Sequence, residues 1–349
     1  MGYPRRTMPS QPITRTPIPE VADLDDETLR REVLASARPT ILRGLVKHWP
    51  AVRHGLASPL AIAQYLADHD NGSQVQAVMT PPDQHGRLFY NADMSGFNFM
   101  RNQLPLSTVL EQVLRYSAFP NPPAVAVQSS PIPDCLPGFV DANPLPLLGR
   151  TIVPRIWLGN AITTPAHFDE SSNVACVVAG RRRFTLFPPE QIANLYIGPL
   201  DHAPTGTPIS LVDFAAPDFE RFPKFREAMA SAQVAELAPG DAIHIPALWW
   251  HQVESLSGFN MLVNYWWRGA LAVDDPLPSA LDSLLHALLC LKSLPAEERR
   301  GWGAIFDHYV FDAQRDAAAH IPPNRRGSLG EMTPELRERL RALLKERLR

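Results

Sequence analysis

The sequence predicts a mainly β fold with flanking helices. Short apolar, β-branched runs separated by Pro and Gly turns dominate residues 121–270, as in a strand-rich core. Residues 20–120 mix helical and strand-like patterns, and residues 271–349 turn helical. The 36 prolines are about twice the usual share, which suits rigid connections between strands. We therefore expect an N-terminal α/β part, a β core and a C-terminal helical region, preceded by a Pro- and Thr-rich flexible arm at residues 1–19.

The N-terminal part shows clear signals for its first elements. Residues 25–34 have helical spacing with acidic residues first, an order that the helix dipole favours. Ser58 is a good N-cap, and the proline that follows it suits the first helical position of a helix over residues 58–66. The remaining patterns predict strands at 40–42 and 74–79 and a helix at 106–116.

In the core, two segments have especially strong strand patterns. Residues 173–178 are apolar and β-branched, as in a buried strand. Pro239-Gly240-Asp241 is a turn signal, and the short strand Ala242–Ile245 follows it. A second strand is expected to begin at His251.

The loop over residues 188–234 is long enough to be functional, and its role stays open. Within it, Phe219, Phe222 and Phe225 recur at helical spacing. They either pack on the core or form a substrate platform.

The C-terminal region carries two helical patterns. Residues 281–289 hold a wide leucine stripe, which packs either on the core or against a second copy of the chain. Residues 333–345 form a capped amphipathic helix whose charges are mixed in sign, as on a solvated face.

Composition excludes several classes of partner. The chain of 349 residues has a formal net charge of −3, so a nucleic-acid partner is not expected. Its three cysteines are scattered and odd in number, which favours a reducing compartment over a disulfide framework. The N-terminus lacks the apolar stretch of a secretory signal, and no run of about 18 apolar residues could span a membrane. We expect a cytoplasmic protein.

The pattern most informative about function is His167-Phe168-Asp169, followed 84 residues later by His251. In an extended segment, residues i and i+2 point to the same face, so His167 and Asp169 would point together. Two histidines and one carboxylate form the facial triad that binds Fe(II) and leaves other coordination positions open. No cysteine lies close enough to the set to indicate a structural zinc site. His244 is interpreted as packed or hydrogen-bonded in its strand rather than as a ligand.

The runs around these residues resemble a known family. They are Thr164–Glu170 with Asn173, then Gly180–Pro189, Gly240–His251 and Asn264–Trp267. Their sequence and spacing are similar to those of the JmjC/cupin-like Fe(II)- and 2-oxoglutarate-dependent oxygenases, and among these to the asparaginyl hydroxylase that inhibits hypoxia-inducible factor. Arg38–Pro50 resembles the start of such domains.

The resemblance implies a double-stranded β-helix, a jelly-roll or cupin barrel, as the core. It also implies Fe(II) in the mouth of the barrel, with 2-oxoglutarate as cosubstrate and O₂ as oxidant. His167, Asp169 and His251 match the iron ligands of the family.

Four further positions match residues of the cosubstrate pocket. Thr164 matches a threonine that contacts the distal carboxylate of 2-oxoglutarate. Arg182 stands where the similar hydroxylase has a lysine for that carboxylate, and a guanidinium can also pair with a carboxylate. Asn173 and Asn264 match two asparagines that line the pocket.

The expected function is therefore hydroxylation of a C–H bond in a protein or peptide side chain. Two alternatives stay open: a small-molecule hydroxylase of the same class, and a non-catalytic metal-binding cupin-like module. The resemblance also implies a homodimer through the C-terminal helices.

Overall fold

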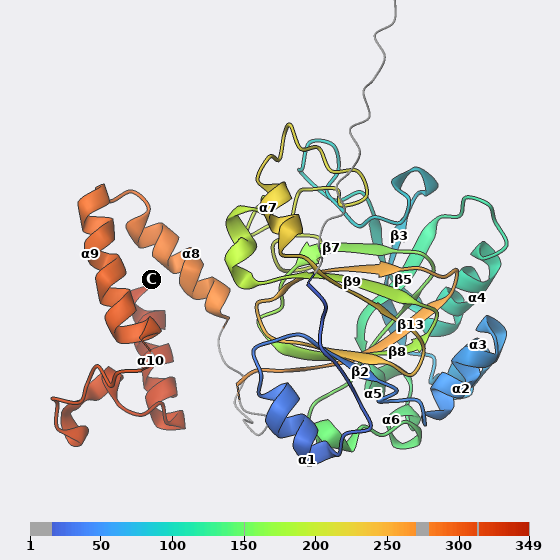
Figure 1. Ribbon diagram of the computed structural model, residues 1–349, viewed down its shortest axis with the longest axis horizontal. Coiled ribbons are helices and arrows are strands. Elements are labelled where there is room, and N and C mark those ends of the chain that lie inside the picture. Colours follow the sequence, from blue (N-terminus) through green and yellow to red (C-terminus); the bar gives the residue numbers. More distant parts are fainter. Residues whose placement is uncertain (1–15, 150, 270–278, 313, 349) are drawn as a thin grey trace, which may run out of the picture. The chain divides into compact units, whose positions relative to one another are not determined.

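The structure is a computed structural model that describes residues 16–149, 151–269, 279–312 and 314–348. The chain divides into two compact units, Met1–Ala272 and Val273–Arg349 (Figure 1). Of the expected arm at 1–19, residues 1–15 lie outside the described residues, whereas Ile18 is buried in the core. No helix in the described ranges is both long and apolar enough to cross a membrane.

The first unit is built on two β-sheets. The larger has nine strands in the order β1-β2-β11-β8-β13-β6-β5-β3-β4, and the smaller has four in the order β10-β9-β12-β7. All neighbouring strands are antiparallel except the parallel pair β1 and β2. The strands are β1 Glu20–Ala22, β2 Thr40–Arg43, β3 Gln74–Thr80, β4 Met100–Pro105, β5 Ala124–Pro131, β6 Arg155–Gly159, β7 Thr163–His167, β8 Ser172–Ala179, β9 Arg182–Phe187, β10 Gln233–Leu237, β11 Ala242–Ile245, β12 Trp250–Ser255 and β13 Asn260–Trp267.

The two sheets face one another across a shared apolar core, which confirms the predicted jelly-roll barrel. Phe184 and Leu186 of the small sheet pack in one cluster with Ala175, Val177 and Leu262 of the large sheet. Burial of this cluster drives the two sheets together, because apolar surface leaves water on both sides at once.

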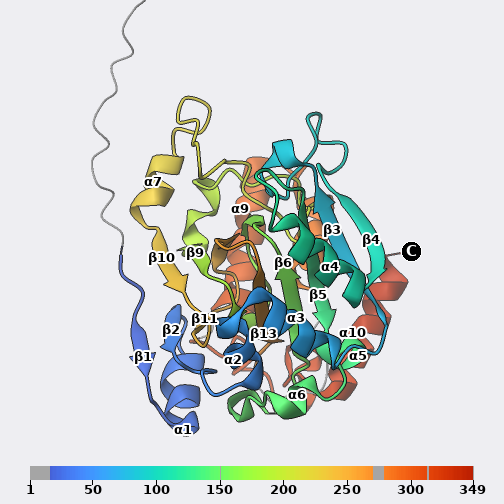
Figure 2. The same cartoon turned by 90° about the vertical axis from the view of Figure 1, so that its right-hand side faces the viewer.

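Helices cover the other face of the large sheet, as Figures 1 and 2 show for α2, α3 and α4. Alternation along β8 explains why its residues 174–179 are all apolar. Val174, Cys176 and Val178 point toward the helices, while Ala175 and Val177 point into the barrel. The helices of this unit are α1 Asp26–Thr28, η1 Leu29–Leu34, α2 Pro50–Ala57, α3 Pro59–Ala67, η2 Pro82–Gln84, α4 Leu106–Tyr116, α5 Ile132–Cys135, α6 Phe139–Ala142, η3 Pro146–Leu148, η4 Pro189–Ala193 and α7 Phe225–Ala230.

Most of the expected elements lie where the sequence placed them. Strands β2, β3, β8 and β11 and helices α3 and α4 match their predicted ranges to within a residue or two. Ser58 caps α3 by accepting a hydrogen bond from the backbone N–H of Ala61 at 3.0 Å. The helix expected over residues 25–34 is present, as α1 followed without a break by the π-helical η1. The wider turn places its buried residues, Leu29, Val33 and Leu34, on one face.

The second unit is helical, as expected. It contains α8 Ala280–Leu291, α9 Ala296–Phe306, the π-helical η5 Asp307–Phe311, the short turns η6 Pro323–Arg325 and η7 Gly327–Leu329, and α10 Pro334–Arg347. Thr333 caps α10 through a hydrogen bond from the backbone N–H of Leu336.

Candidate metal centre

His167 and His251 meet across two paired strands of the small sheet. They are direct partners in the register of β7 and β12, and their ring centroids lie 4.3 Å apart. The register then shifts, so that the two residues of β7 between Thr164 and His167 oppose the single residue of β12 between His251 and Val253. This bulge brings Thr164 onto the same face as His167, although strand alternation alone would separate them.

The hydrogen bonds of both rings leave the same nitrogen free. His167 Nδ1 lies 2.9 Å from the carbonyl oxygen of Pro165, and His251 Nδ1 lies 2.9 Å from that of Trp249. A carbonyl oxygen only accepts, so each Nδ1 carries the proton and each Nε2 keeps its lone pair. Burial, together with the nearby His251, lowers the pKa of His167 to about 4, which keeps this ring neutral at pH 7. Imidazoles whose Nδ1 atoms bind backbone carbonyls present their Nε2 atoms to a metal ion.

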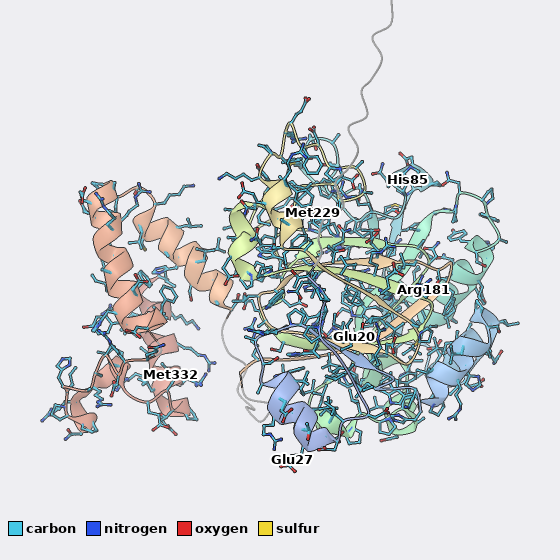
Figure 3. All side chains as sticks on the ribbon, viewed as in Figure 1. Glu20, Glu27, His85, Arg181, Met229 and Met332 are labelled. Atoms are coloured by element: carbon cyan, nitrogen blue, oxygen red, sulfur yellow. The ribbon has the colours of Figure 1, made fainter. Side chains whose placement is uncertain are left out.

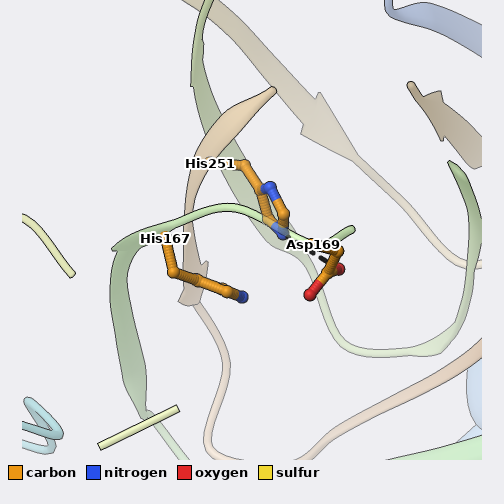
Figure 4. A group of neighbouring side chains, drawn as sticks. All are labelled: His167, Asp169 and His251. Carbon is orange, nitrogen blue, oxygen red and sulfur yellow. Dashed lines mark ion pairs between the residues drawn. The ribbon is translucent and has the colours of Figure 1, made fainter. Parts of the chain in front are cut away.

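Asp169 reaches the two histidines from just beyond the end of β7. The expectation that His167 to Asp169 is one extended strand is wrong at its end, because β7 stops at His167. The backbone N–H of Leu248 donates to the Asp169 carbonyl at 2.8 Å and fixes the turn. The Asp169 carboxylate lies beside the imidazoles in Figure 4, with Oδ2 at 3.6 Å from His251 Nε2.

These three side chains form the one group in the described part of the chain that could hold a metal ion. One ligand atom from each lies within 4.8 Å of the others. Two imidazole nitrogens and one carboxylate oxygen are the donor set of a mononuclear iron site. The residues present therefore fit an Fe(II) ion.

A cavity of about 280 Å³ opens on this group. Thr164, His167 and Asp169 line it, together with apolar and polar side chains of the large sheet. A ligand in this cavity would reach the open side of the metal ion. A cavity of this volume suits a small ligand or a single side chain rather than a folded protein.

Arg182 is a buried cation inside the barrel. It shares its strand face with Phe184 and Leu186, and only 6% of its surface is exposed. Burial lowers the pKa of its guanidinium to about 10, so the group stays charged at pH 7. Among the described residues it forms no ion pair with a carboxylate, and its Nε has no hydrogen-bond partner. An uncompensated buried charge costs several kcal/mol, so the position suits an anionic ligand. By contrast, its neighbours Arg181 and Arg183 face outward and pair with Glu236; Figure 3 labels Arg181.

Polar groups from both sheets point into the same barrel interior as Arg182. Ser255 is the β12 partner of Arg182, and its buried hydroxyl has no partner among the described residues. Asn173 Oδ1 is also buried and without a partner there. Asn264 Oδ1 accepts a hydrogen bond from Trp157 Nε1 at 2.9 Å. Thr164 lines the cavity with the metal group, whereas Asn173, Arg182 and Asn264 are buried but form no part of its wall.

The cupin-like domain family model matches residues 26–272. The chain belongs to the cupin-like domain family. The match covers every strand except β1 and every residue of the site, and the resemblance to the JmjC/cupin-like oxygenases is confirmed.

Several curated proteins are similar to this chain in sequence. Lysine-specific demethylase 8 of Xenopus tropicalis is 25% identical over 73% of this chain and 53% of its own length. The human bifunctional peptidase and (3S)-lysyl hydroxylase JMJD7 is 26% identical over 74% of this chain and 85% of its own length. Human HSPB1-associated protein 1 is 32% identical over 39% of this chain and 27% of its own length. The chain thus spans about a quarter to a half of the first relatives it matches.

One residue of this cupin-like site was not predicted from the sequence. Trp266 Nε1 donates a hydrogen bond to Asp169 Oδ2 at 3.1 Å, and its ring packs edge-on against Trp157 at 6.0 Å. It lies on β13, and the strand register that brings it to Asp169 is not visible in either local motif. The hydrogen bond orients the carboxylate that completes the metal group.

We predict that Trp266→Phe weakens metal binding by at least about tenfold, because loss of a partner that orients a ligand has that effect. The measurement is an isothermal calorimetric titration with Mn²⁺. Trp267→Phe is the matched control, since Trp267 follows it on β13 but packs on the opposite face against His244. Equal affinities in the two variants would show that the indole N–H does not position Asp169.

The long loop over residues 188–234 has two roles in this structure. Phe222 and Phe225 are buried and Phe219 is partly buried, in a cluster with Trp250, so these rings pack rather than form an open platform. Nearer the start of the loop, Pro204, Thr205 and Gly206 form part of the cavity wall. His244, by contrast, is fully buried, stacks on Trp267 and takes no part in the metal group.

Proposed function

We propose that this chain is an Fe(II)- and 2-oxoglutarate-dependent oxygenase that uses O₂ to hydroxylate a C–H bond in a protein or peptide side chain. The observation that carries the proposal is the His167–Asp169–His251 group. Both imidazoles of this group direct an unprotonated Nε2 toward the carboxylate at the end of a cavity.

In this proposal His167, Asp169 and His251 would hold the iron ion through two imidazole nitrogens and one carboxylate oxygen. Bound iron supplies the oxidising chemistry, together with 2-oxoglutarate and O₂. The chain's own residues orient the side chains that would bind the metal ion. The two backbone carbonyls fix the imidazole tautomers, and Trp266 fixes the carboxylate.

Arg182 and Thr164 are proposed to bind the distal carboxylate of 2-oxoglutarate. The buried guanidinium provides the charge, and the unpartnered hydroxyl of Ser255 beside it provides a further donor. Asn173 and Asn264 are proposed to line the pocket, where the free Oδ1 of Asn173 can accept a hydrogen bond.

The direct test is succinate formation from 2-oxoglutarate with Fe(II) under air. The purified chain is expected to form succinate in an iron-dependent reaction that N-oxalylglycine inhibits. A chain that binds a metal ion but neither binds N-oxalylglycine nor forms succinate would instead be the non-catalytic metal-binding module. Stimulation of turnover by free amino acids or other metabolites, with none by peptides, would establish the small-molecule hydroxylase alternative.

We further propose a homodimer through the C-terminal helices. Leu284, Leu285 and Leu289 of α8 are exposed, Leu289 by 76%, and an apolar stripe of this kind favours pairing with an identical one. Light scattering is expected to give a dimer mass for the chain and a monomer mass for Leu285→Glu/Leu289→Glu. Leu60→Glu, at an exposed leucine of α3, should leave the dimer intact. A monomer mass for the unchanged chain would contradict the proposal.

The proposed organisation divides the chain into the N-terminal α/β part at 20–120, the double-stranded β-helix at 121–270 and the helical region at 271–349. We also propose a cytoplasmic location. All three cysteines are free of disulfides, and Cys135 and Cys176 are buried. Fractionation of cells that produce the chain tests this location.

A further inference from the structure

The charged groups on the cavity wall carry information about the substrate. Among the described residues that line it, Asp169 is the one carboxylate and Arg101 the one guanidinium. If the metal site works as proposed above, Fe²⁺ and Asp169 together are singly positive, and 2-oxoglutarate is doubly negative. The guanidinium of the buried Arg182 cancels the single negative charge that remains. The positive charge of Arg101 is then not balanced by the metal or the cosubstrate, and it can pair with a charge on the substrate.

Arg101 is held at the wall without a carboxylate partner. It lies on β4, and its Nη2 donates to the carbonyl oxygen of Pro204 at 2.7 Å. Its guanidinium carbon lies 5.4 Å from the ring centroids of both Phe97 and Phe99, which stack on each other. No ion pair joins Arg101 to an acidic group in the described ranges of the chain. The remaining N–H groups can therefore bind a carboxylate.

Neutral donors lie on the same wall. Gln128 and Ser129 both line the cavity although they are consecutive in β5, where alternation would turn one of them away. The left-handed backbone of Ser129, with φ of 49°, produces this arrangement at a shift in the β5–β6 register. Arg155 Nη1 donates to the Ser129 carbonyl at 2.6 Å and holds the strained turn. The conformation adds hydrogen-bonding groups to the wall but no negative charge.

From this wall we infer that the substrate residue is acidic: an aspartyl or glutamyl side chain of a peptide, whose carboxylate pairs with Arg101. This deepens the proposed function and rests on it. A lysine side chain, which the name of the human lysyl hydroxylase relative specifies for that protein, would bring its ammonium group toward Arg101. The described wall offers no carboxylate for it except Asp169, which the metal occupies.

The test measures binding rather than turnover. Fluorescent peptides that differ only in a central Asp, Glu, Asn or Lys are titrated into the full chain loaded with Mn²⁺ and N-oxalylglycine. We expect the Asp or Glu peptide to bind at least about tenfold more tightly than the Lys peptide. Arg101→Gln should remove this preference, and Arg101→Glu should reverse it. Arg53→Glu is the matched control, because Arg53 is also exposed, unpaired with any described carboxylate and bonded to one backbone carbonyl, that of His48.

Three results would overturn the inference. One is equal or tighter binding of the Lys or Asn peptide by the unchanged chain. Another is weaker N-oxalylglycine binding in Arg101→Gln, which would assign Arg101 to the cosubstrate. The third is binding of free N-acetylaspartate as tight as that of the Asp peptide, which would make the substrate a small acid. Failure of the proposed function is distinguished separately, because the chain would then bind no Mn²⁺ or N-oxalylglycine before any peptide is added.

Discussion

His251→Ala is expected to lower iron-dependent succinate formation by more than about 100-fold. Changes in groups that only orient a metal ligand cost about 10- to 100-fold, so loss of the ligand itself must cost more. His251 is 3% exposed, and its Nε2 is one of only two unprotonated imidazole nitrogens in the metal group of the described chain. The measurement is initial-rate succinate formation at saturating Fe(II) and 2-oxoglutarate.

Two controls separate loss of the metal from loss of the fold. His48→Ala removes an exposed imidazole in the same unit and should leave the rate unchanged. Circular dichroism of His251→Ala should match that of the unchanged chain, because the alanine still fits the pairing of β12 with β7. A folded His251→Ala variant with more than half the normal rate would exclude His251 as a ligand.

Arg182→Met is expected to weaken N-oxalylglycine binding by at least about 100-fold. Removing one partner of a buried ion pair costs about 3–5 kcal/mol, and each 1.4 kcal/mol is about a factor of ten in affinity. The same change should stabilise the chain without ligand, because it removes a buried charge that has no anionic partner among the described residues. Calorimetry measures the first effect and thermal unfolding the second.

The opposite signs of these two effects make the test specific. Arg183→Met is the matched control, since Arg183 is adjacent on β9 but faces outward and pairs with Glu236. It should change neither N-oxalylglycine affinity nor the ligand-induced rise in melting temperature. If Arg182→Met lowers the stability of the ligand-free chain and leaves the affinity intact, then Arg182 has a structural role only.

The parts of the site that the sequence predicts are those carried by local spacing. His167 and Asp169 lie two residues apart, and the run before His251 has strong turn and strand signals, so pattern and resemblance together identify them. The pairing of β7 with β12 then brings His251 beside His167. The sequence does not reveal that β7 ends before Asp169, because the turn there is held by a backbone hydrogen bond from the distant Leu248.

The residues that the sequence does not reveal depend on contacts between distant strands. Trp266 meets Asp169 across 97 positions in the chain, and Ser255 meets Arg182 only through the register of β12 with β9. Arg101 reaches the cavity from β4, an edge strand of the large sheet whose sequence resembles any exposed strand. Hydrophobic periodicity reports which face of a strand is buried, but it does not report which strands become neighbours.

The central claim is that His167, Asp169 and His251 bind a single Fe(II) ion, and an anaerobic calorimetric titration with Fe(II) tests it most directly. The account predicts one ion per chain and loss of measurable binding in each of His167→Ala, Asp169→Ala and His251→Ala. Iron binding of unchanged stoichiometry and affinity in these three variants would contradict it.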